Sequence, residues 1–427
     1  MTPDFSSTPP RRICVLRLSA LGDVCHALPV VRTLQDAWPS AEFTWILGKL
    51  EHKLLGHLPG IEFIVLDKKA GRAAYADLRR RIAGRRYDVL LHMQLALRAS
   101  IAAMRVPADV KIGFDRARAR ELQWLFTNTK IEPRRREHVL DSLFGFAERL
   151  GLRQRSMRWD IPLPEGALEY ARRAIPDGQP TLVISPCSSH ALRNWSPERY
   201  AAVADHAAAR HGLRVLLCGG RSALELEYGE RIAALAQRPL VNLVGQDTLL
   251  EFLATLQRAK ALLSPDSGPA HMATTVGTPV IGLYAATNPA RSGPYDSRQW
   301  CVDRYDAAAL QFRRRPAAGG RVLEHDAPGW LDPEHLGGGQ ERLGVGLAGG
   351  HVVGGYQAIG HREPGAAPTL LQPAMVRGPL RGGRAPLPGP VRGRIAVDRE
   401  DRGTGRHGPD HRGRRRGTTR RATPGAG

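Results

Sequence analysis

The amino-acid sequence predicts an α/β protein with two doubly wound domains, each built on a parallel sheet. The chain has 427 residues, more than one hydrophobic core usually serves, so two domains are expected. From residue 13 onward, apolar runs of strand length alternate with longer stretches of helical period, and this alternation occurs twice. Near-continuous apolarity within the short runs is typical of central strands that helices cover on both faces.

Each domain is predicted to contain five strands. They lie at 13–18, 42–47, 62–67, 87–93 and 110–114 in the first domain, and at 181–186, 214–220, 239–245, 259–265 and 279–285 in the second. An amphipathic helix at about 138–151 precedes a Pro-rich connection, which indicates a boundary near 165–178. We expect a first domain over 12–170 and a second over 178–310.

Ligands of such sheets bind beyond the carboxyl ends of the strands. Two domains that face each other therefore form a cleft, and the chemistry is expected on the loops that lead from strand to helix.

Residues 311–427 show no such periodicity. In 313–427, Gly and Arg make up 46 of 115 residues, and apolar clusters are too sparse to offset the entropy of ordering the chain. We predict a disordered or non-native tail of low complexity, of the kind that a frameshifted GC-rich gene would encode. A basic RNA-binding tail is the alternative, although regular RGG repeats and interleaved aromatic residues are missing.

The formal net charge of +21 is divided between this tail and the rest of the chain. Residues 313–427 hold 20 Arg, no Lys and 10 acidic residues and contribute +10, so residues 1–312 carry +11. The globular part is thus only moderately basic, and no nucleic-acid partner is expected for it.

Two features bear on the cellular compartment. The N-terminal sequence MTPDFSSTPPRR lacks the order of a signal peptide, and no window approaches the roughly 20 apolar residues of a membrane span, so we expect a cytoplasmic protein. Neither a CxxC pair nor metal-ligand spacing occurs among the cysteines, which are predicted to be buried, reduced thiols: Cys14, Cys25, Cys187, Cys218 and Cys301.

The first motif is LRLSALGDVCHALP at 16–29, where a strand runs through a short loop into a helix. Gly22 permits a close backbone approach or a positive φ. Asp23 is expected at the helix N-terminus in the mouth of the cleft, with His26 one turn later on a nearby face. Two interpretations of Asp23 stay open, an ordinary helix cap and a catalytic carboxylate. The loop is not GxGxxG, so a dinucleotide cofactor is not indicated.

The second motif, SPCSSHALRNWSPERY at 185–200, follows the first strand of the second domain. Ser188, Ser189 and Arg193 offer two hydroxyl groups and a permanent cation, which suit a phosphate or diphosphate. The alternative is a solvated loop before a helix that Ser196 caps. Trp195 is expected in the core.

The third motif, at 264–295, begins SPDSGPAHMATTVGTP. Asp266, Ser267 and Gly268 lie between a strand and a helix, so backbone N–H groups and the positive helix end are expected to face an anion in the cleft. His271, one turn into that helix, is interpreted either as a ligand or as a buried core histidine. Glu225 follows another strand, where it can accept ribose hydroxyl groups or simply begin a helix.

Taken together and in this order, LRLSALGDVCHALP, the SS…RxW loop and PDSGPAHMA…GTPVIGLYAATNP resemble glycosyltransferase family nine, the ADP-heptose:lipopolysaccharide heptosyltransferases. The resemblance covers about residues 12–305, and its GDxxH and D-[ST]-G-x-x-H elements are specific in combination. It implies the GT-B architecture of two facing Rossmann-like domains. The N-terminal domain would hold a lipid-linked acceptor and the C-terminal domain the ADP-sugar.

The resemblance also implies roles for individual residues. Asp23 would be the general base that deprotonates the acceptor hydroxyl, which attacks the heptose anomeric carbon with inversion. Arg193, often Lys in the family, would neutralise charge on the departing ADP, so no metal or other cofactor is expected. The remaining donor-site positions are Ser188, Ser189, Glu225, Asp266, Ser267, Gly268 and His271.

Acceptor contacts are expected from Arg98, Arg120 and His26 of the first domain. The implied partners are ADP-heptose and either Kdo-lipid A or an already heptosylated core, and GDVCHALP favours the first-heptose enzymes. A basic first domain would also contact the anionic inner face of the inner membrane.

Three alternatives remain open at this point. The chain is another GT-B transferase with a different nucleotide sugar, a non-enzymatic binder of nucleic acid or anionic surfaces through its Arg-rich tail, or an inactive product of a disrupted gene. Family members close with further helices that residues after about 310 do not supply.

Overall fold

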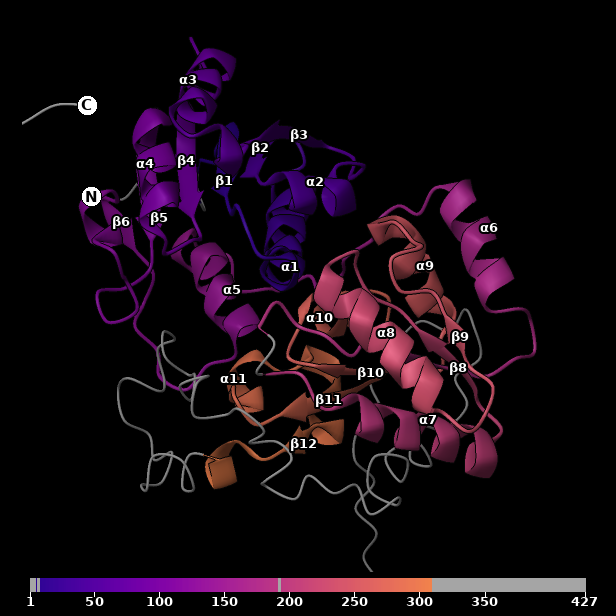
Figure 1. The fold of residues 1–427 in the computed structure, drawn as a ribbon. Helices are drawn as coiled ribbons and strands as arrows, with labels where there is room; N and C mark the ends of the chain where they lie inside the picture. The colour runs from indigo at the N-terminus through magenta and orange to yellow at the C-terminus, as the bar shows by residue number, and fades with distance from the viewer. Residues whose placement is uncertain (1–4, 6–7, 191–192, 309–427) are drawn as a thin grey trace, which may run out of the picture. The chain divides into compact units, whose positions relative to one another are not determined.

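The computed structural model describes residues 5, 8–190 and 193–308, which all belong to the first of the two units into which the chain divides, Met1–Arg362. The predicted tail at 311–427 lies outside the described residues. Within them, two six-stranded sheets are present, each with helices on both faces (Figure 1).

All strand pairs of the first sheet are parallel, and the strand order is β3-β2-β1-β4-β5-β6. This is the order 3-2-1-4-5-6 of a Rossmann fold. The strands are β1 (Arg12–Leu16), β2 (Glu42–Leu47), β3 (Ile61–Val65), β4 (Tyr87–His92), β5 (Ala108–Gly113) and β6 (Thr129–Lys130). The helices are α1 (Leu21–Ala37), α2 (Lys49–Leu55), η1 (Lys68–Ala70), α3 (Arg72–Arg81), α4 (Leu97–Arg105), η2 (Gln123–Leu125) and α5 (Val139–Arg149).

The second sheet repeats this topology in the order β12-β11-β10-β7-β8-β9, again with parallel pairs. Its strands are β7 (Thr181–Ile184), β8 (Arg214–Leu217), β9 (Val241–Asn242), β10 (Ala261–Pro265), β11 (Val280–Tyr284) and β12 (Val302–Asp303). Its helices are α6 (Glu165–Ala174), α7 (Pro197–His211), α8 (Ala223–Leu235), α9 (Leu249–Arg258), α10 (Gly268–Thr275), α11 (Pro289–Ser292) and η4 (Tyr295–Trp300).

Alternate residues of the central strands enter different cores. In β1, Ile13 and Val15 belong to a core shared with α1 and α5, whereas Cys14 and Leu16 face the core on the other side of the sheet. The first of these cores continues into the second half of the chain, where it includes Met272 of α10. Apolar side chains on both faces explain why these strands read as uninterrupted apolar runs.

All ten predicted strands are present, and the helix predicted at about 138–151 is α5. The prediction missed β6 and β12, which have two residues each. The predicted strand at 239–245 is shorter, because only Val241–Asn242 pair with β8.

The predicted end of the first domain, residue 170, falls inside α6. A first domain ending at residue 170 would divide α6, whose Ala167 and Ala171 pack against Ala254 of α9. The limits 12–170 and 178–310 stay a prediction.

Candidate active site

Asp23 lies just past the carboxyl end of β1, in the first turn of α1. Its carboxylate accepts a hydrogen bond from the backbone N–H of Ala20 at 2.9 Å, and Arg17 Nη2 lies 2.5 Å from Asp23 Oδ2. The Asp23 side chain is still 34% exposed, whereas that of Arg17 is 11% exposed. Asp23 is therefore not the N-cap of α1, which is Ala20, but the third residue of the helix. Its carboxylate reaches back to the N-cap N–H and is held at the protein surface.

The loop before Asp23 is held by residues that follow β4. The backbone N–H of Leu18 donates to Gln94 Oε1 at 2.6 Å, and Gln94 Nε2 donates to Ser19 Oγ at 3.2 Å. Arg98 also donates to Ser19 Oγ, at 3.1 Å, so the structure brings this predicted residue to the loop that carries Asp23. Sequence reasoning missed Gln94, although a polar residue at a strand's carboxyl end was the available signal.

Asp23 lines a pocket of about 380 Å³, here called the arginine pocket. Five arginines contribute to its wall, namely Arg17, Arg118, Arg134, Arg136 and Arg291. Four come from the first half of the chain, and Arg291 comes from α11 in the second half. Such a wall suits a ligand rich in carboxylates or phosphates. None of the five was predicted as a site residue, although Arg17 falls within the first motif and Arg291 within the third. The predicted acceptor residues Arg98 and Arg120 are not among the lining residues.

Arg118 shapes this pocket from a buried position. Its guanidinium pairs with Asp115, lies 3.1 Å from Glu137 Oε2, and donates to Ser142 Oγ at 2.6 Å and to the Glu132 carbonyl at 2.7 Å. Arg118 thus fastens the loop after β5 to the segment that leads into α5.

The second half presents a different arrangement at the N-terminus of α10. Asp266 and Ser267 are buried between β10 and α10, and Ser267 Oγ is 2.8 Å from Ser264 Oγ. Arg193 Nη1 donates to the Asp266 carbonyl at 3.1 Å and lies 3.6 Å from Asp266 Oδ2. His271 Nε2 is 3.8 Å from Asp266 Oδ1. The second and third motifs therefore meet at the N-terminus of α10. The binding of an anion at this helix end stays a prediction.

Burial affects both charged groups of this cluster. Burial lowers the pKa of Arg193 to about 10, which still leaves the guanidinium charged at neutral pH. Burial alone would raise the pKa of Asp266, but the neighbouring His271 and Arg193 outweigh it and lower that pKa. The pair is therefore an ionised carboxylate beside a fixed cation.

The other predicted donor residues follow two strands of the second sheet, β7 and β8. Ser188 follows β7, and its hydroxyl contacts the backbone of His190, while Ser189 is exposed. Glu225 accepts hydrogen bonds from Gly220 N–H at 2.7 Å and Ser222 Oγ at 2.6 Å, within the capping box of α8. Glu225 is therefore engaged as a helix cap in the structure. Trp195 is buried, as predicted.

The first and third motifs approach each other closely at Gly22 and Gly268. A Cβ atom on Gly22 would lie 2.3 Å from His271 Cδ2, and a Cβ on Gly268 would lie 3.3 Å from Leu21 Cβ. Gly22 therefore serves the predicted close approach, across which α1 packs against α10.

Three histidine rings meet beside this contact. The ring of His26 is 4.5 Å from that of His271 and 5.2 Å from that of His138. His138 Nε2 donates to the Gly293 carbonyl at 2.9 Å, and its Nδ1 accepts from Leu140 N–H, so the neutral ring is fully engaged. Burial, together with the charges of His271 and His138, lowers the pKa of His26 well below its usual value. His26 is not among the residues that line the arginine pocket, and its acceptor contact stays a prediction.

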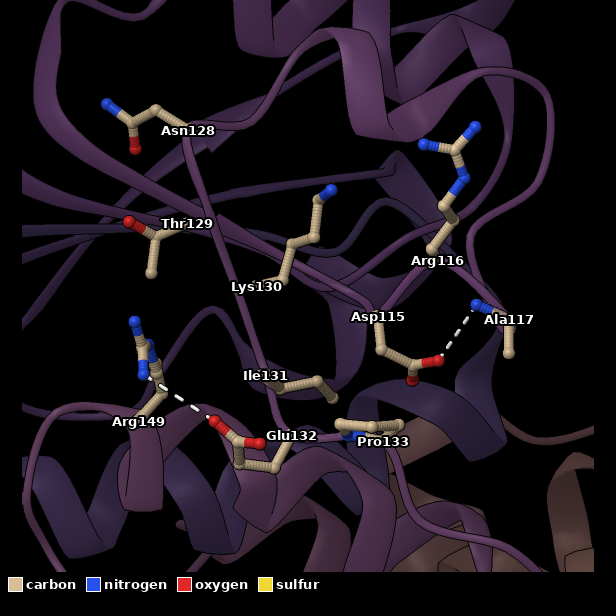
Figure 2. A pocket seen from close by; sticks show the side chains of 10 residues that line it. All are labelled: Asp115, Arg116, Ala117, Asn128, Thr129, Lys130, Ile131, Glu132, Pro133 and Arg149. Carbon is tan, nitrogen blue, oxygen red and sulfur yellow. Dashed lines mark hydrogen bonds and ion pairs between the residues drawn. The ribbon is translucent and has the colours of Figure 1, made fainter.

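A second pocket, here called the β6 pocket, lies along β6 (Figure 2). Its basic lining residues are Arg116, Lys130 and Arg149. Its acidic residues already form ion pairs: Asp115 pairs with Arg118, and Glu132 Oε1 lies 3.6 Å from Arg149 Nη1.

Among residues 5, 8–190 and 193–308, no helix is long and apolar enough to cross a membrane. Over the same residues, no group of three or more His, Cys, Asp or Glu side chains is arranged to hold a metal ion.

Two Rossmann-like halves, with an Arg193–Asp266 cluster at a helix end in one and a carboxylate in a basic pocket in the other, are the arrangement of the GT-B fold. The model of glycosyltransferase family 9 (heptosyltransferase) matches residues 75–318. The lipopolysaccharide core heptosyltransferase OpsX of Haemophilus influenzae is 42% identical over 309 residues, which cover 72% of this chain and 89% of OpsX. Lipopolysaccharide heptosyltransferase 1 of Escherichia coli K12 is 24% identical over 312 residues, covering 67% of this chain and 92% of that protein.

This chain belongs to glycosyltransferase family 9, and the predicted enzyme class, a glycosyltransferase, is confirmed. A family 9 glycosyltransferase from Veillonella parvula superposes with a TM-score of 0.62 at 22% identity, covering 80% of this chain and 98% of that one. The heptosyltransferase WaaC of E. coli with ADP gives a TM-score of 0.56 at 23% identity, covering 66% of this chain and 90% of WaaC. These similarities confirm the predicted GT-B fold.

Proposed function

We propose that this enzyme transfers heptose from ADP-heptose to the Kdo or heptose residues of the lipopolysaccharide inner core. The names of its relatives support this, since OpsX acts in the lipopolysaccharide core and WaaC has been solved with ADP and with ADP-2-deoxy-2-fluoro heptose. The observation that carries the proposal is the contact of Gly22 with His271. Through it, Asp23 in the arginine pocket and the Asp266–Arg193 cluster stand on opposite sides of one close approach between α1 and α10.

In the proposed reaction, Asp23 removes the proton from an acceptor hydroxyl as that oxygen attacks the anomeric carbon of heptose. The bond between the anomeric carbon and the diphosphate oxygen breaks, ADP leaves with the electron pair, and the configuration inverts. The proton remains on Asp23. Arg17 supports this role because its ion pair fixes the direction of the carboxylate.

The second half of the chain is proposed to stabilise the negative charge on the departing ADP. Arg193 supplies a fixed cation, and the backbone N–H groups at the start of α10 supply dipoles, so the reaction is proposed to need no metal. The donor would contact this helix end and the loops after β7 and β8 through Ser188, Ser189, Glu225, Asp266, Ser267, Gly268 and His271.

The acceptor is proposed to occupy the arginine pocket. Arg98 keeps its proposed acceptor role beside Ser19, which lines the pocket. Arg120 and His26 stay proposed acceptor contacts. The lining arginines add positive charge for Kdo carboxylates and lipid A phosphates. The site of action is proposed to be the cytoplasmic face of the inner membrane, where such an acceptor is anchored.

The test is heptose transfer by the full chain from ADP-heptose to Kdo-lipid A. Asp23→Asn keeps the size of the side chain and is expected to lower kcat by about 10³-fold, since a general base contributes about 10²–10⁴. Asp36→Asn is the matched control, because Asp36 lies exposed on the same helix and pairs with Arg158. ADP binding should be equal in all three proteins, and chelator should leave the rate unchanged.

Two results would contradict the proposal. Full activity in Asp23→Asn would remove Asp23 as the base. Binding of ADP without transfer to Kdo-lipid A or to a heptosylated core would favour another GT-B transferase with a different acceptor.

A further inference from the structure

Three exposed leucines lie together beside the arginine pocket and are called the leucine patch. Leu97, Leu122 and Leu125 are 44%, 54% and 58% exposed. Leu97 begins α4, and its backbone N–H donates to the carboxylate of Glu121, which joins it to the segment that carries the other two. Leu95 and Ala96, directly before Leu97, line the arginine pocket. The leucine patch therefore adjoins the border of that pocket at Leu97.

The patch is held firmly by a buried glutamine. Gln123, which is fully buried, lies between Leu122 and Leu125. Its Nε2 donates to the carbonyls of His92 and Gln94, at 2.8 and 3.0 Å, and its Oε1 accepts from Phe114 N–H at 3.1 Å. These bonds tie the segment to the carboxyl ends of β4 and β5. The two leucines thus project from an anchored turn.

The backbone of this turn is itself unusual. Glu121 and Leu122 have φ angles of 47° and 60°, in the left-handed region that residues other than glycine rarely adopt. Nothing in the burial of Leu122 compensates for this conformation, because its side chain is exposed. Strained backbone that is maintained in a fold is most often found where it serves function.

Positive charge flanks two leucines of the patch in the sequence and lines the two pockets. Residues 116–136 contain six arginines and one lysine against two glutamates. Arg134 and Arg136 line the arginine pocket, and Arg116 and Lys130 line the β6 pocket (Figure 2). Exposed apolar side chains flanked by basic ones form the combination that binds the interface of an anionic bilayer.

We propose that the leucine patch and its flanking basic residues dock the first half of the chain onto the headgroup layer of an anionic membrane. This inference rests on the proposed function, because the acceptor proposed there is anchored in a membrane by its lipid. Docking at the pocket border would bring the acceptor sugar to Asp23 while its acyl chains stay in the bilayer.

Charge argues against two other occupants. Residues 313–427 of this chain carry a net charge of +10, which would repel the basic border of the patch. A second copy placed by two-fold symmetry would set the same arginines against each other. An anionic lipid surface instead complements both the leucines and the arginines.

The experiment measures binding of the full chain to vesicles by co-sedimentation, with neither donor nor acceptor present. One set of vesicles is phosphatidylcholine alone, and the other contains about 30% phosphatidylglycerol to give a negative surface. The test variant is Leu122→Ser with Leu125→Ser. Its matched control is Leu226→Ser with Leu235→Ser, since these leucines are 40% and 44% exposed on α8 in the second half.

The wild-type chain is expected to prefer the anionic vesicles and to lose binding at high salt. The test variant is expected to bind them about tenfold more weakly, since two inserted leucines are replaced, whereas the control variant should match the wild type. Equal binding by the test variant and the wild type would overturn the proposal and assign membrane affinity to another part of the chain. A change of oligomeric state in the test variant, with vesicle binding intact, would overturn it in favour of a contact between copies.

A second measurement separates this proposal from the proposed function. Transfer to an acceptor without acyl chains should be equal in the test variant and the wild type, because docking is not needed for a soluble acceptor. It also shows that the test variant is folded. If no protein transfers heptose to that acceptor, the proposed function fails while the vesicle result still decides the docking surface.

Discussion

The two halves of the described chain share one topology and differ in how they present charge. β1 lies between β2 and β4, as β7 lies between β8 and β10. Past the strand ends, the first half contributes four arginines to an open pocket around one partly exposed carboxylate. The second half instead buries a single arginine, Arg193, against Asp266 at a helix end.

From this difference we infer that equal scaffolds would recognise the proposed anionic substrates in two ways. In the first half several arginines line one pocket, so the loss of a single exposed one such as Arg136 is expected to matter little. In the second half one buried arginine, Arg193, lies against Asp266 at a helix N-terminus, so its loss is expected to matter more. The following predictions test this contrast, from the largest expected effect to the smallest.

Arg118 is the exception among the arginines of the first half, because it is buried. Arg118→Ala is expected to lower the free energy of unfolding by about 3–5 kcal/mol, since it leaves Asp115 and Glu137 without their shared cation. Arg134→Ala, at a half-exposed ion pair, should cost about 1 kcal/mol or less. Denaturant titration of both variants measures this, and equal losses would show that burial does not distinguish the two arginines.

Arg193→Ala should affect catalysis more than any single surface arginine of the pocket. We expect kcat to fall by about 10²–10³-fold, the usual result of removing one preorganised group that stabilises developing charge. Arg136→Ala should lower kcat/KM by less than about tenfold, because other arginines remain nearby. Steady-state kinetics with both substrates decides, and Arg210→Ala on the exposed face of α7 is the control. A loss of similar size in Arg136→Ala would mean that the pocket arginines are not redundant.

The contact between the halves should weaken in acid through His138. Burial lowers the pKa of His138 to about 4, so the unfolded chain binds the proton first. Stability is therefore complete above about pH 6.5 and is lost as the pH falls toward 4, by about 2–3 kcal/mol for this ring. Unfolding measured over this range should show a smaller slope in His138→Asn, while His57→Asn, at an exposed position, should keep the wild-type slope. An unchanged slope in His138→Asn would assign the acid sensitivity to other groups.

The smallest effect concerns Glu225, which is both a proposed donor contact and a helix cap. Glu225→Ala and Ser222→Ala each break the capping box of α8 and should lower the free energy of unfolding by about 0.5–1 kcal/mol. Only Glu225→Ala should raise the KM for ADP-heptose. If both variants leave that KM unchanged, Glu225 serves the helix alone.

The sequence was sufficient for most of the fold because its central strands are buried on both faces. Such strands have uninterrupted apolar runs, and the ten predicted strands include all of them, together with β3 and β9 at sheet edges. β6 and β12 escaped because two residues at a sheet edge show no periodicity, whereas β9, which is equally short, lies within the apolar run at 239–245. The contact of α6 with α9 escaped because apolar helix faces do not reveal their partners.

The candidate site divides in the same way. Asp23, Arg193 and Asp266 lie in motifs whose local spacing places them at strand ends, and the structure brings the last two together. Gln94, Arg118 and His138 act through contacts with residues far away in the chain, as in the bond from His138 to Gly293. No local pattern distinguishes such residues from ordinary polar ones, so only the three-dimensional arrangement identifies them.

The absence of a side chain at Gly22 has a thermodynamic consequence. His271 of α10 lies directly against the backbone that precedes Asp23, so the two proposed substrate sites adjoin each other. Coupling between them would need no chain of intermediate residues. By linkage, any factor by which the proposed donor changes the affinity for the acceptor would also be the factor by which the acceptor changes the affinity for the donor. A change in the packing of α1 against α10 would therefore be enough to alter the order in which the two substrates bind.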